Sequence, residues 1–140
     1  MTKNSRIIID SNYYLALSNR SDSLHQEAVN LTHQIEKNQA VISDYIFSEI
    51  MTVASQKISK ESAAMLGSSL LNNPLVQITT IDHSLFIESW HIFSQLKQKN
   101  ISFVNCSILA MMKQLKIKKL LSFDHADFSP LQKQFNFELI

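Results

Sequence analysis

The segment "ISFVNCSILAMMKQLKIKKLLSFDHADF" (residues 101–128) holds the clearest evidence on the fold. Apolar side chains recur in it at intervals of three and four residues, which predicts a helix over 103–115. The β-rich run "KKLLSF" (118–123) follows and leads to Asp124, with Asp127 three positions further on. A helix followed by a short, apolar strand is typical of a parallel sheet that is buried on both faces.

The same alternation continues through the whole chain. Helical patterns occupy 22–37, 44–57, 60–72, 83–98 and 103–115. Short strands are expected over 6–10, 40–43, 76–81, 118–123 and 135–140. Ser43, Asp44 and Asp82 stand where N-caps of the following helices are expected. This order predicts an α/β three-layer sandwich, in which helices flank a central, mostly parallel sheet of about four to five strands. No repeat or linker interrupts the pattern, so we expect a single domain over 1–140.

Composition narrows the class of protein. Apolar residues make up 45% of the 140 residues and charged residues 18%, as in a globular domain with a proper core. No apolar run is long enough to span a membrane, and the apolar run in "MTKNSRIIID" is too short for a signal peptide. Cys106 is the single cysteine, so a reducing cytoplasm is expected. The net charge of +1 indicates no global basic field, and one glycine excludes glycine-rich phosphate loops.

Carboxylates follow two of the predicted strands. Asp10 ends the first strand, and Asp124 and Asp127 follow the strand at 118–123. Ligands of open α/β sheets bind beside the carboxyl ends of the strands, so these acids are candidates for one site. Capping of the next helix is the other role open to Asp10.

Two polar side chains interrupt apolar helix faces. Glu49 has Ile46 and Val53 among its helical neighbours, and Asn105 has Ile108 and Leu109. A buried carboxylate is costly unless it is paired or binds a metal, although an ion pair or hydrogen bond to a neighbouring element would also satisfy Glu49. If these groups converge with the strand-end acids, their oxygen atoms would select Mg²⁺ or Mn²⁺. Such a site activates water for attack on phosphorus.

At this point the residues resemble a known family. "IIIDSNYYLAL" (7–17) is similar to the opening of a PIN-domain nuclease, and "VISDYIFSEI" (41–50) resembles the second motif, which places a Glu on a helix. The segment 102–128 resembles the third and fourth motifs, an Asp near a helix start and then a "TxDxDF"-like run. The ordered set covers almost the full chain.

The resemblance implies a function as well as a fold. It is strongest to the toxins of VapBC toxin–antitoxin pairs and therefore implies an Mg²⁺-dependent endoribonuclease. It further implies a homodimer and an antitoxin of VapB type that occludes the site. Asp10, Glu49, Asp124 and Asp127 match family acids that act in catalysis and metal binding, with Asp124 preferred over Asp127 as the fourth acid.

Asn105 departs from the family pattern, because it aligns with the third acid. An amide has nearly the shape of a carboxylate but no charge and half the acceptor capacity, so it should weaken metal binding and cannot act as a general base. Three explanations stay open: an engineered Asp→Asn change that silences the nuclease, a natural pseudo-enzyme, or reduced activity carried by the remaining acids. The alternative function is a catalytically inactive module that binds RNA or protein. A phosphoryl acceptor role for Asp10 is disfavoured, because no two acids are adjacent anywhere in the chain.

Other polar groups lie near these positions in the sequence. Ser11 and Asn12 could cap the first helix or orient Asp10. His125 is expected in a loop. Four lysines near the end of the predicted helix 103–115 form a group that we call the lysine cluster. It complements the dipole at the helix end or, alternatively, forms a phosphate-contacting rim beside the site. Its members are Lys113, Lys116, Lys118 and Lys119.

Overall fold

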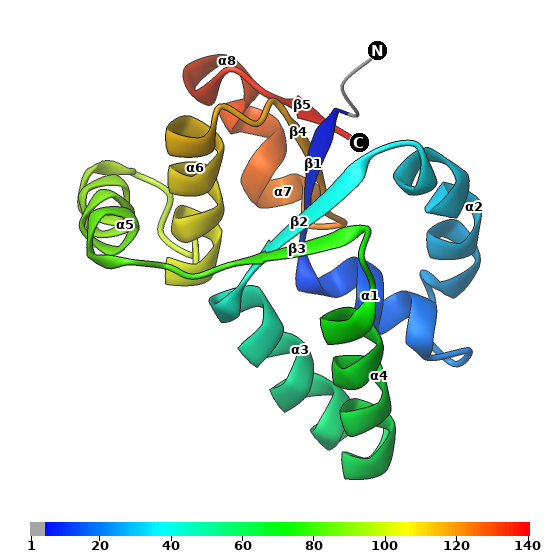
Figure 1. Cartoon of the computed structure of the whole chain (residues 1–140). Helices are drawn as coiled ribbons and strands as arrows, with labels where there is room; N and C mark the ends of the chain where they lie inside the picture. Colours follow the sequence, from blue (N-terminus) through cyan, green and yellow to red (C-terminus); the bar gives the residue numbers. More distant parts are fainter. Residues whose placement is uncertain (1–4) are drawn as a thin grey trace.

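The structure of the protein is a computed structural model that describes residues 5–140 (Figure 1). The first four residues of the N-terminal stretch considered above lie outside this range. Within residues 5–140, five strands form one sheet in the order β3-β2-β1-β4-β5, and all neighbouring pairs are parallel. The strands are β1 (Arg6–Ile9), β2 (Gln39–Ser43), β3 (Val76–Thr79), β4 (Lys119–Leu121) and β5 (Glu138–Leu139). Helices lie on both sides of the sheet, so the predicted three-layer α/β fold is confirmed.

The long helices follow the predicted pattern, except for α1, which none of the predicted helical ranges covers. They are α1 (Ser11–Ser18), α2 (His25–Glu36), α3 (Asp44–Lys57), α4 (Lys60–Asn72), α5 (His83–Gln95) and α6 (Phe103–Leu115). The predicted bounds of α3, α4 and α6 are confirmed, whereas α2 and α5 are shorter than predicted. The Ser43 hydroxyl accepts a hydrogen bond from the amide of Ile46 (3.0 Å), and the Asp82 carboxylate accepts one from Leu85 (2.9 Å), so both cap helices as expected.

The chain after β4 is more helical than its sequence suggested. Two short helices, α7 (His125–Phe128) and α8 (Gln132–Phe135), flank a 3₁₀ turn at Ser129–Leu131. The prediction of a loop at His125 is therefore wrong. The cause is local: the Asp124 carboxylate accepts a hydrogen bond from the amide of Asp127 (3.3 Å), which caps the start of a helical turn.

The core explains why α6 is so apolar. Every residue of α6 from 105 to 112 is buried, because the sheet covers one side of the helix and α5 packs along another (Figure 1). In the sheet, the side chains of Ile7, Ile8 and Ile9 are 0% exposed. None of the helices within residues 5–140 combines the length and the apolar character needed to cross a membrane.

The parallel topology brings chain segments that are distant in sequence to one edge of the sheet. The amide of Asp10, directly after β1, donates a hydrogen bond to the carbonyl of Leu121 at the end of β4 (2.9 Å). The ends of these central strands are therefore adjacent, and the polar residues that follow them share a site.

Candidate active site

Asp10 lies at the centre of the site. It is 3% exposed, and its Oδ1 atom accepts a hydrogen bond from the backbone amide of Ser11 (2.8 Å). Its Oδ2 atom accepts one from the Ser122 hydroxyl (2.7 Å). Asp10 is therefore the N-cap of α1 and at the same time directs its second carboxylate oxygen toward the end of β4. The capping role considered for Asp10 from the sequence is confirmed.

Ser122 and Asn12 join the ends of β1 and β4. The Ser122 hydroxyl is fully buried and also accepts hydrogen bonds from the amide of Asp124 (3.0 Å) and from the Asn12 side chain (3.2 Å). The Oδ1 atom of Asn12 accepts a hydrogen bond from the amide of Phe123 (3.0 Å). Ser122 was not singled out from the sequence. The available signal was a hydroxyl side chain at the end of an apolar strand, two positions before an acid.

Glu49 reaches the same site from α3. The Ser11 hydroxyl donates a short hydrogen bond to its Oε1 atom, so Ser11 links Glu49 to Asp10. The Glu49 side chain is half-buried, which fits a carboxylate at the margin between core and solvent. Both Ser11 and Asn12 thus contact the site in addition to their places in the first turn of α1.

Asn105, Asp124 and Asp127 form the other half of the site. The Nδ2 atom of Asn105, near the start of α6, donates to Asp124 Oδ2 and to Asp127 Oδ2, at 3.1 Å in each case. Asn105 is 7% exposed, and its backbone position is set by Ser102, whose hydroxyl caps α6. The amide therefore holds two carboxylates together through donated hydrogen bonds.

Burial and mutual repulsion raise the pKa values of two acids. Burial raises the pKa of Asp10 to about 6, against opposing hydrogen bonds from Ser122 and Ser11, and the negative charges of Glu49 and Asp124 raise it further. Burial, together with the charge of Asp124, also raises the pKa of Asp127, although the hydrogen bond from Asn105 lowers it. The site thus concentrates negative charge in a poorly solvated place.

The oxygen atoms of the site are chemically suitable ligands for a hard divalent cation. Carboxylate oxygens are the ligands that such ions prefer, and a cation would offset the burial and, to a smaller extent, the neighbouring negative charges that raise the pKa of Asp10. Within residues 5–140, however, no three His, Cys, Asp or Glu side chains stand close enough together to hold one ion. Asn105 contributes to this, because it directs an N–H group at Asp124 and Asp127.

The surface beside Glu49 is apolar. An apolar hollow of about 600 Å³ adjoins Glu49 and is lined by Tyr45, Phe86 and Phe103.

Burial, with a smaller effect from Asp127, raises the pKa of the Cys106 thiol to about 11, so this cysteine stays protonated and is no nucleophile.

The lysine cluster does not form a rim beside the site. Asn105 lies near the start of α6, whereas Lys116 is the C-cap of the same helix, roughly 16 Å away along the helix axis. Lys118 and Lys119 then lead into the amino end of β4, the end opposite to Asp124. The hypothesis of a phosphate-contacting rim next to the acids is therefore wrong.

With this geometry established, comparison with known proteins is informative. Residues 7–133 match the PIN domain family. The chain belongs to this family. Within it, this PIN domain is VapC-like. The 23S rRNA-specific endonuclease VapC20 of Mycobacterium tuberculosis is 23% identical to it over 123 residues, which cover 88% of this chain and 92% of VapC20.

Solved structures share the fold. The crystal structure of Mycobacterium tuberculosis VapC20, described as a Sarcin-Ricin loop cleaving toxin, superposes with a TM-score of 0.80 at 22% identity and covers 89% of this PIN domain and 93% of that chain. A chain in the structure of VapBC2 from Rickettsia felis, bound to a DNA fragment from its promoter, has a TM-score of 0.70 at 16% identity, with 96% and 97% covered.

Proposed function

We propose that this PIN domain is the toxin of a VapBC-like pair, a metal-dependent endoribonuclease whose activity in this chain is weakened by Asn105. One observation carries the proposal. Ser122 joins Asp10 to the backbone of Asp124 at the ends of two neighbouring parallel strands, and Glu49 and Asn105 adjoin them from two helices. The likeness to VapC20, an rRNA endonuclease by name, supports RNA as the substrate. The single cysteine supports a cytoplasmic location.

The cofactor that we propose is Mg²⁺ or Mn²⁺, held by Asp10 and Asp124 with Glu49 and Asp127 close by. When bound, such a cation neutralises phosphate charge and lowers the pKa of a water molecule. The donor chemistry supports this assignment, and so does the burial of Asp10, which raises its pKa together with the smaller effects of the Glu49 and Asp124 charges and which a cation would offset.

The residues of the chain have distinct parts in this proposal. Ser122 holds the Asp10 carboxylate and the Asp124 amide in a fixed relation, so the two acids present their oxygens to a phosphodiester together. Ser11 fixes Glu49 through its Oε1 atom, which leaves Oε2 to orient a water molecule or accept its proton. Burial of Asp10 excludes bulk water from one side of the site.

Asn105 supports a second candidate function. Its N–H group already bridges Asp124 and Asp127, so these two acids are held together without a cation. A chain in which this bridge replaces the metal would be an inactive module that still binds RNA or an antitoxin. This alternative makes the opposite prediction for cleavage.

The partners that we propose are RNA, an antitoxin of VapB type and a second copy of the chain. The likeness to the VapBC2 chain supports an antitoxin. Support for a homodimer comes from the outer face of α5, which carries large exposed apolar side chains that a partner would cover. They are Phe86, Ile87, Trp90 and Phe93.

The test is a cleavage assay on pooled tRNA and rRNA with Mg²⁺ or Mn²⁺, each repeated with EDTA. It compares the chain with Asn105→Asp, and with a double variant that adds Asp10→Asn as a control for contaminating nuclease. We expect Asn105→Asp to cleave far faster than the parent chain, EDTA to stop cleavage, and the double variant to be inactive. If Asn105→Asp binds RNA but leaves it intact, the binding module is correct and the nuclease proposal fails.

A further inference from the structure

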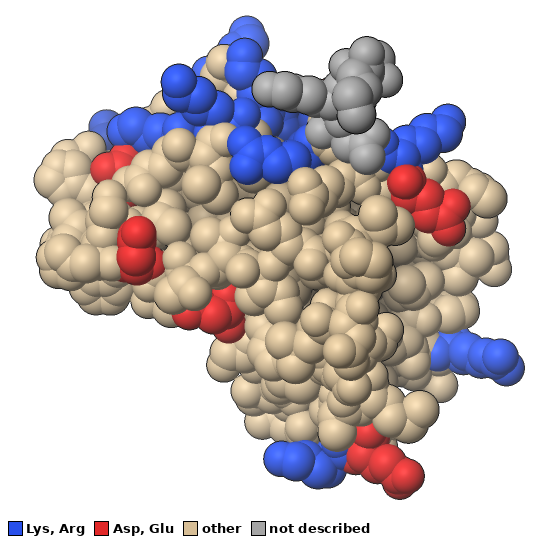
Figure 2. All heavy atoms as spheres, viewed as in Figure 1, with Lys and Arg blue, Asp and Glu red and all other residues tan. Residues whose placement is uncertain are grey.

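Basic residues gather at the end of the molecule opposite to the acids. Within residues 5–140, five Lys and Arg residues lie where β1 and β4 begin and α6 ends, and we name this set the basic end. Its members are Arg6, Lys113, Lys116, Lys118 and Lys119. Figure 2 shows Lys and Arg side chains concentrated at the upper end of the view, where Figure 1 places the start of β1. Although the net charge is only +1, basic side chains are therefore concentrated at one end of the molecule.

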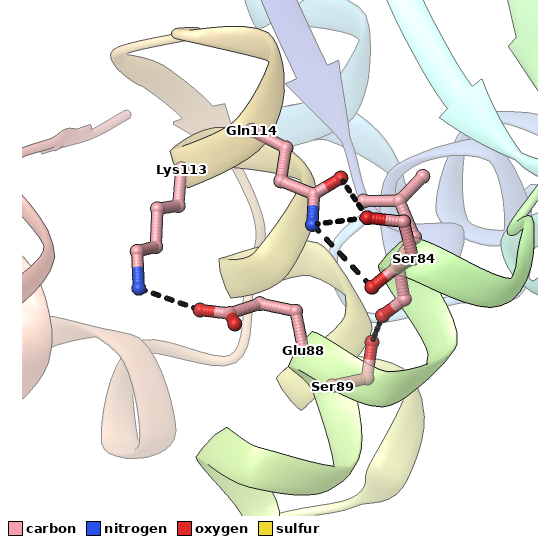
Figure 3. A network of polar contacts seen from close by, with 6 residues as sticks. Ser84, Glu88, Ser89, Lys113 and Gln114 are labelled. Atoms are coloured by element: carbon pink, nitrogen blue, oxygen red, sulfur yellow. Dashed lines mark hydrogen bonds and ion pairs between the residues drawn. The ribbon is translucent and has the colours of Figure 1, made fainter.

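Structural roles account for only part of this set. Arg6 donates a hydrogen bond to the Leu115 carbonyl (2.7 Å) and so caps the end of α6. Lys113 is held by Glu88 of α5 at 2.6 Å, in the polar network that joins the two helices (Figure 3). Lys118 and Lys119 stand beyond the helix, so the α6 dipole does not explain them.

Lys116, Lys118 and Lys119 form no ion pair with any residue from 5 to 140. The side chains of Lys116 and Lys118 are exposed, whereas Lys119 is half-buried. Lys116 has a left-handed backbone (φ 56°), which ends α6 and turns the chain across this end of the molecule toward β4. Two acids adjoin the basic end, Glu88 beside Lys113 and Glu138 paired in register with Lys119, and neither pairs with Lys116 or Lys118.

Two hollows at the basic end are lined partly by amide groups. Lys113 lines a hollow of about 460 Å³ together with Gln95, Asn136 and the carboxylate of Glu88. Lys119 lines another of about 480 Å³ together with Lys37, Asn38 and the carboxylate of Glu138. Lysine ammonium and side-chain amide groups are common contacts of phosphate and sugar in nucleic acids. Protein interfaces, in contrast, are depleted in lysine.

We propose that the basic end binds the phosphate backbone of RNA, at a place remote from the acids that cleave it. The inference deepens the proposed function and rests on it for the identity of the ligand. Asn105 and Lys116 are separated by roughly 16 Å along α6, and a stacked strand rises about 3.4 Å per nucleotide. A stacked RNA strand that contacts both ends therefore extends roughly five nucleotides beyond the cleaved bond. The substrate class is thus a long or folded RNA rather than a short oligonucleotide.

The experiment measures RNA binding by the full chain, so it does not depend on cleavage. The variant Lys116→Asn/Lys118→Gln removes the two exposed charges. At position 116 it keeps a residue that tolerates the left-handed backbone. Lys116→Arg/Lys118→Arg retains the charges, and Lys60→Gln removes an exposed charge at the start of α4. Affinity for a long unlabelled rRNA fragment and for an oligonucleotide of about four nucleotides is titrated over a series of salt concentrations.

We expect the charge-removing pair to bind the long RNA on the order of tenfold more weakly and to lose about 1.4 from the slope of log K against log salt concentration, about 0.7 for each phosphate contact. The arginine pair and Lys60→Gln should match the parent, and binding of the short oligonucleotide should not change. Unchanged affinity and slope for the long RNA in the charge-removing pair would overturn the proposal. The proposal would also be overturned if the charge-removing pair lost affinity only for duplex DNA or only for an acidic partner protein. If Asn105→Asp fails to cleave while this salt-dependent loss is observed, the nuclease assignment fails and the basic end stands.

Discussion

The Nδ2 atom of Asn105 lies 3.1 Å from Oδ2 of Asp124 and donates a hydrogen bond that a carboxylate at position 105 could not supply. The same nitrogen bonds Asp127, so a single amide holds two acids from the segment after β4. An Asp at this position would convert the contact into repulsion among three carboxylates. The chemistry of the site and its stability are therefore linked through one side chain.

The first prediction concerns this link. In EDTA, Asn105→Asp should lower the free energy of unfolding by about 1–3 kcal/mol, because two partly buried hydrogen bonds are lost and a third negative charge is added. Millimolar Mg²⁺ or Mn²⁺ should restore most of that loss. Thermal unfolding with and without each cation measures both effects.

Asn30→Asp, on the exposed surface of α2, adds the same charge away from the site and is the matched control. It should change the melting temperature little in either condition. Equal stability of Asn105→Asp and the parent chain in EDTA would show that the amide bridge contributes nothing.

The second prediction is a pH dependence of stability caused by Asp10. Its pKa is raised from 3.8 to about 6, so the folded protein holds this proton more tightly than the unfolded chain does. The free energy of unfolding should therefore fall as the pH rises from about 4 to 6 and stay low above 6, by about 3 kcal/mol in total from this group. Urea titrations at a series of pH values measure the slope.

Asp10→Asn removes this titration. The difference in unfolding free energy between variant and parent should shift by about 3 kcal/mol in favour of the variant between pH 4 and pH 7. Comparing the two pH values cancels any constant cost of the altered hydrogen bonds. Parallel curves for the two proteins would assign the pH dependence to another group.

The third prediction concerns Ser122. Ser122→Ala should destabilise the fold by about 1–3 kcal/mol, because the buried Oδ2 atom of Asp10 and the amide of Asp124 lose their common partner. It should also raise the pKa of Asp10 further, since the Ser122 hydrogen bond is the largest effect that lowers it. The stability slope described for Asp10 should then move to higher pH.

Ser129→Ala, at an exposed position, serves as the control for loss of a serine hydroxyl and should leave both quantities unchanged. A Ser122→Ala protein with the parent's pH profile would mean that this hydroxyl does not stabilise the ionised form of Asp10.

The fourth prediction tests the proposed dimer. Trp90 is 52% exposed on α5 and stacks on Phe93, with ring centroids 6.1 Å apart. Trp90→Glu should leave monomer stability within about 0.5 kcal/mol, as expected of a surface position, but should prevent self-association. Sedimentation velocity over a concentration series measures this.

Met65→Glu on α4 alters an even more exposed apolar side chain, 69% exposed, on a different helix. It should leave self-association intact. If the parent chain stays monomeric at all concentrations, or if Met65→Glu is the variant that dissociates it, the α5 face is not the interface.

Local patterns in the sequence were sufficient to predict most of the secondary structure. The bounds of α3, α4 and α6 follow from apolar periodicity and from caps such as Ser43, because these signals act within a few residues. The short helix α7 was missed because its start depends on one capping bond between Asp124 and Asp127 in a stretch without periodicity.

The sequence by itself determined the fold class, the strand ends that carry acids and the unusual amide at position 105. Only the tertiary structure decided which of these groups meet. Ser122 contacts Asp10 across 112 positions of the chain, and no local pattern records such a contact because it depends on the order and register of parallel strands. Conversely, Lys116 is close to Asn105 in sequence but lies at the opposite end of the molecule, since a helix of 13 residues separates its two ends by several turns.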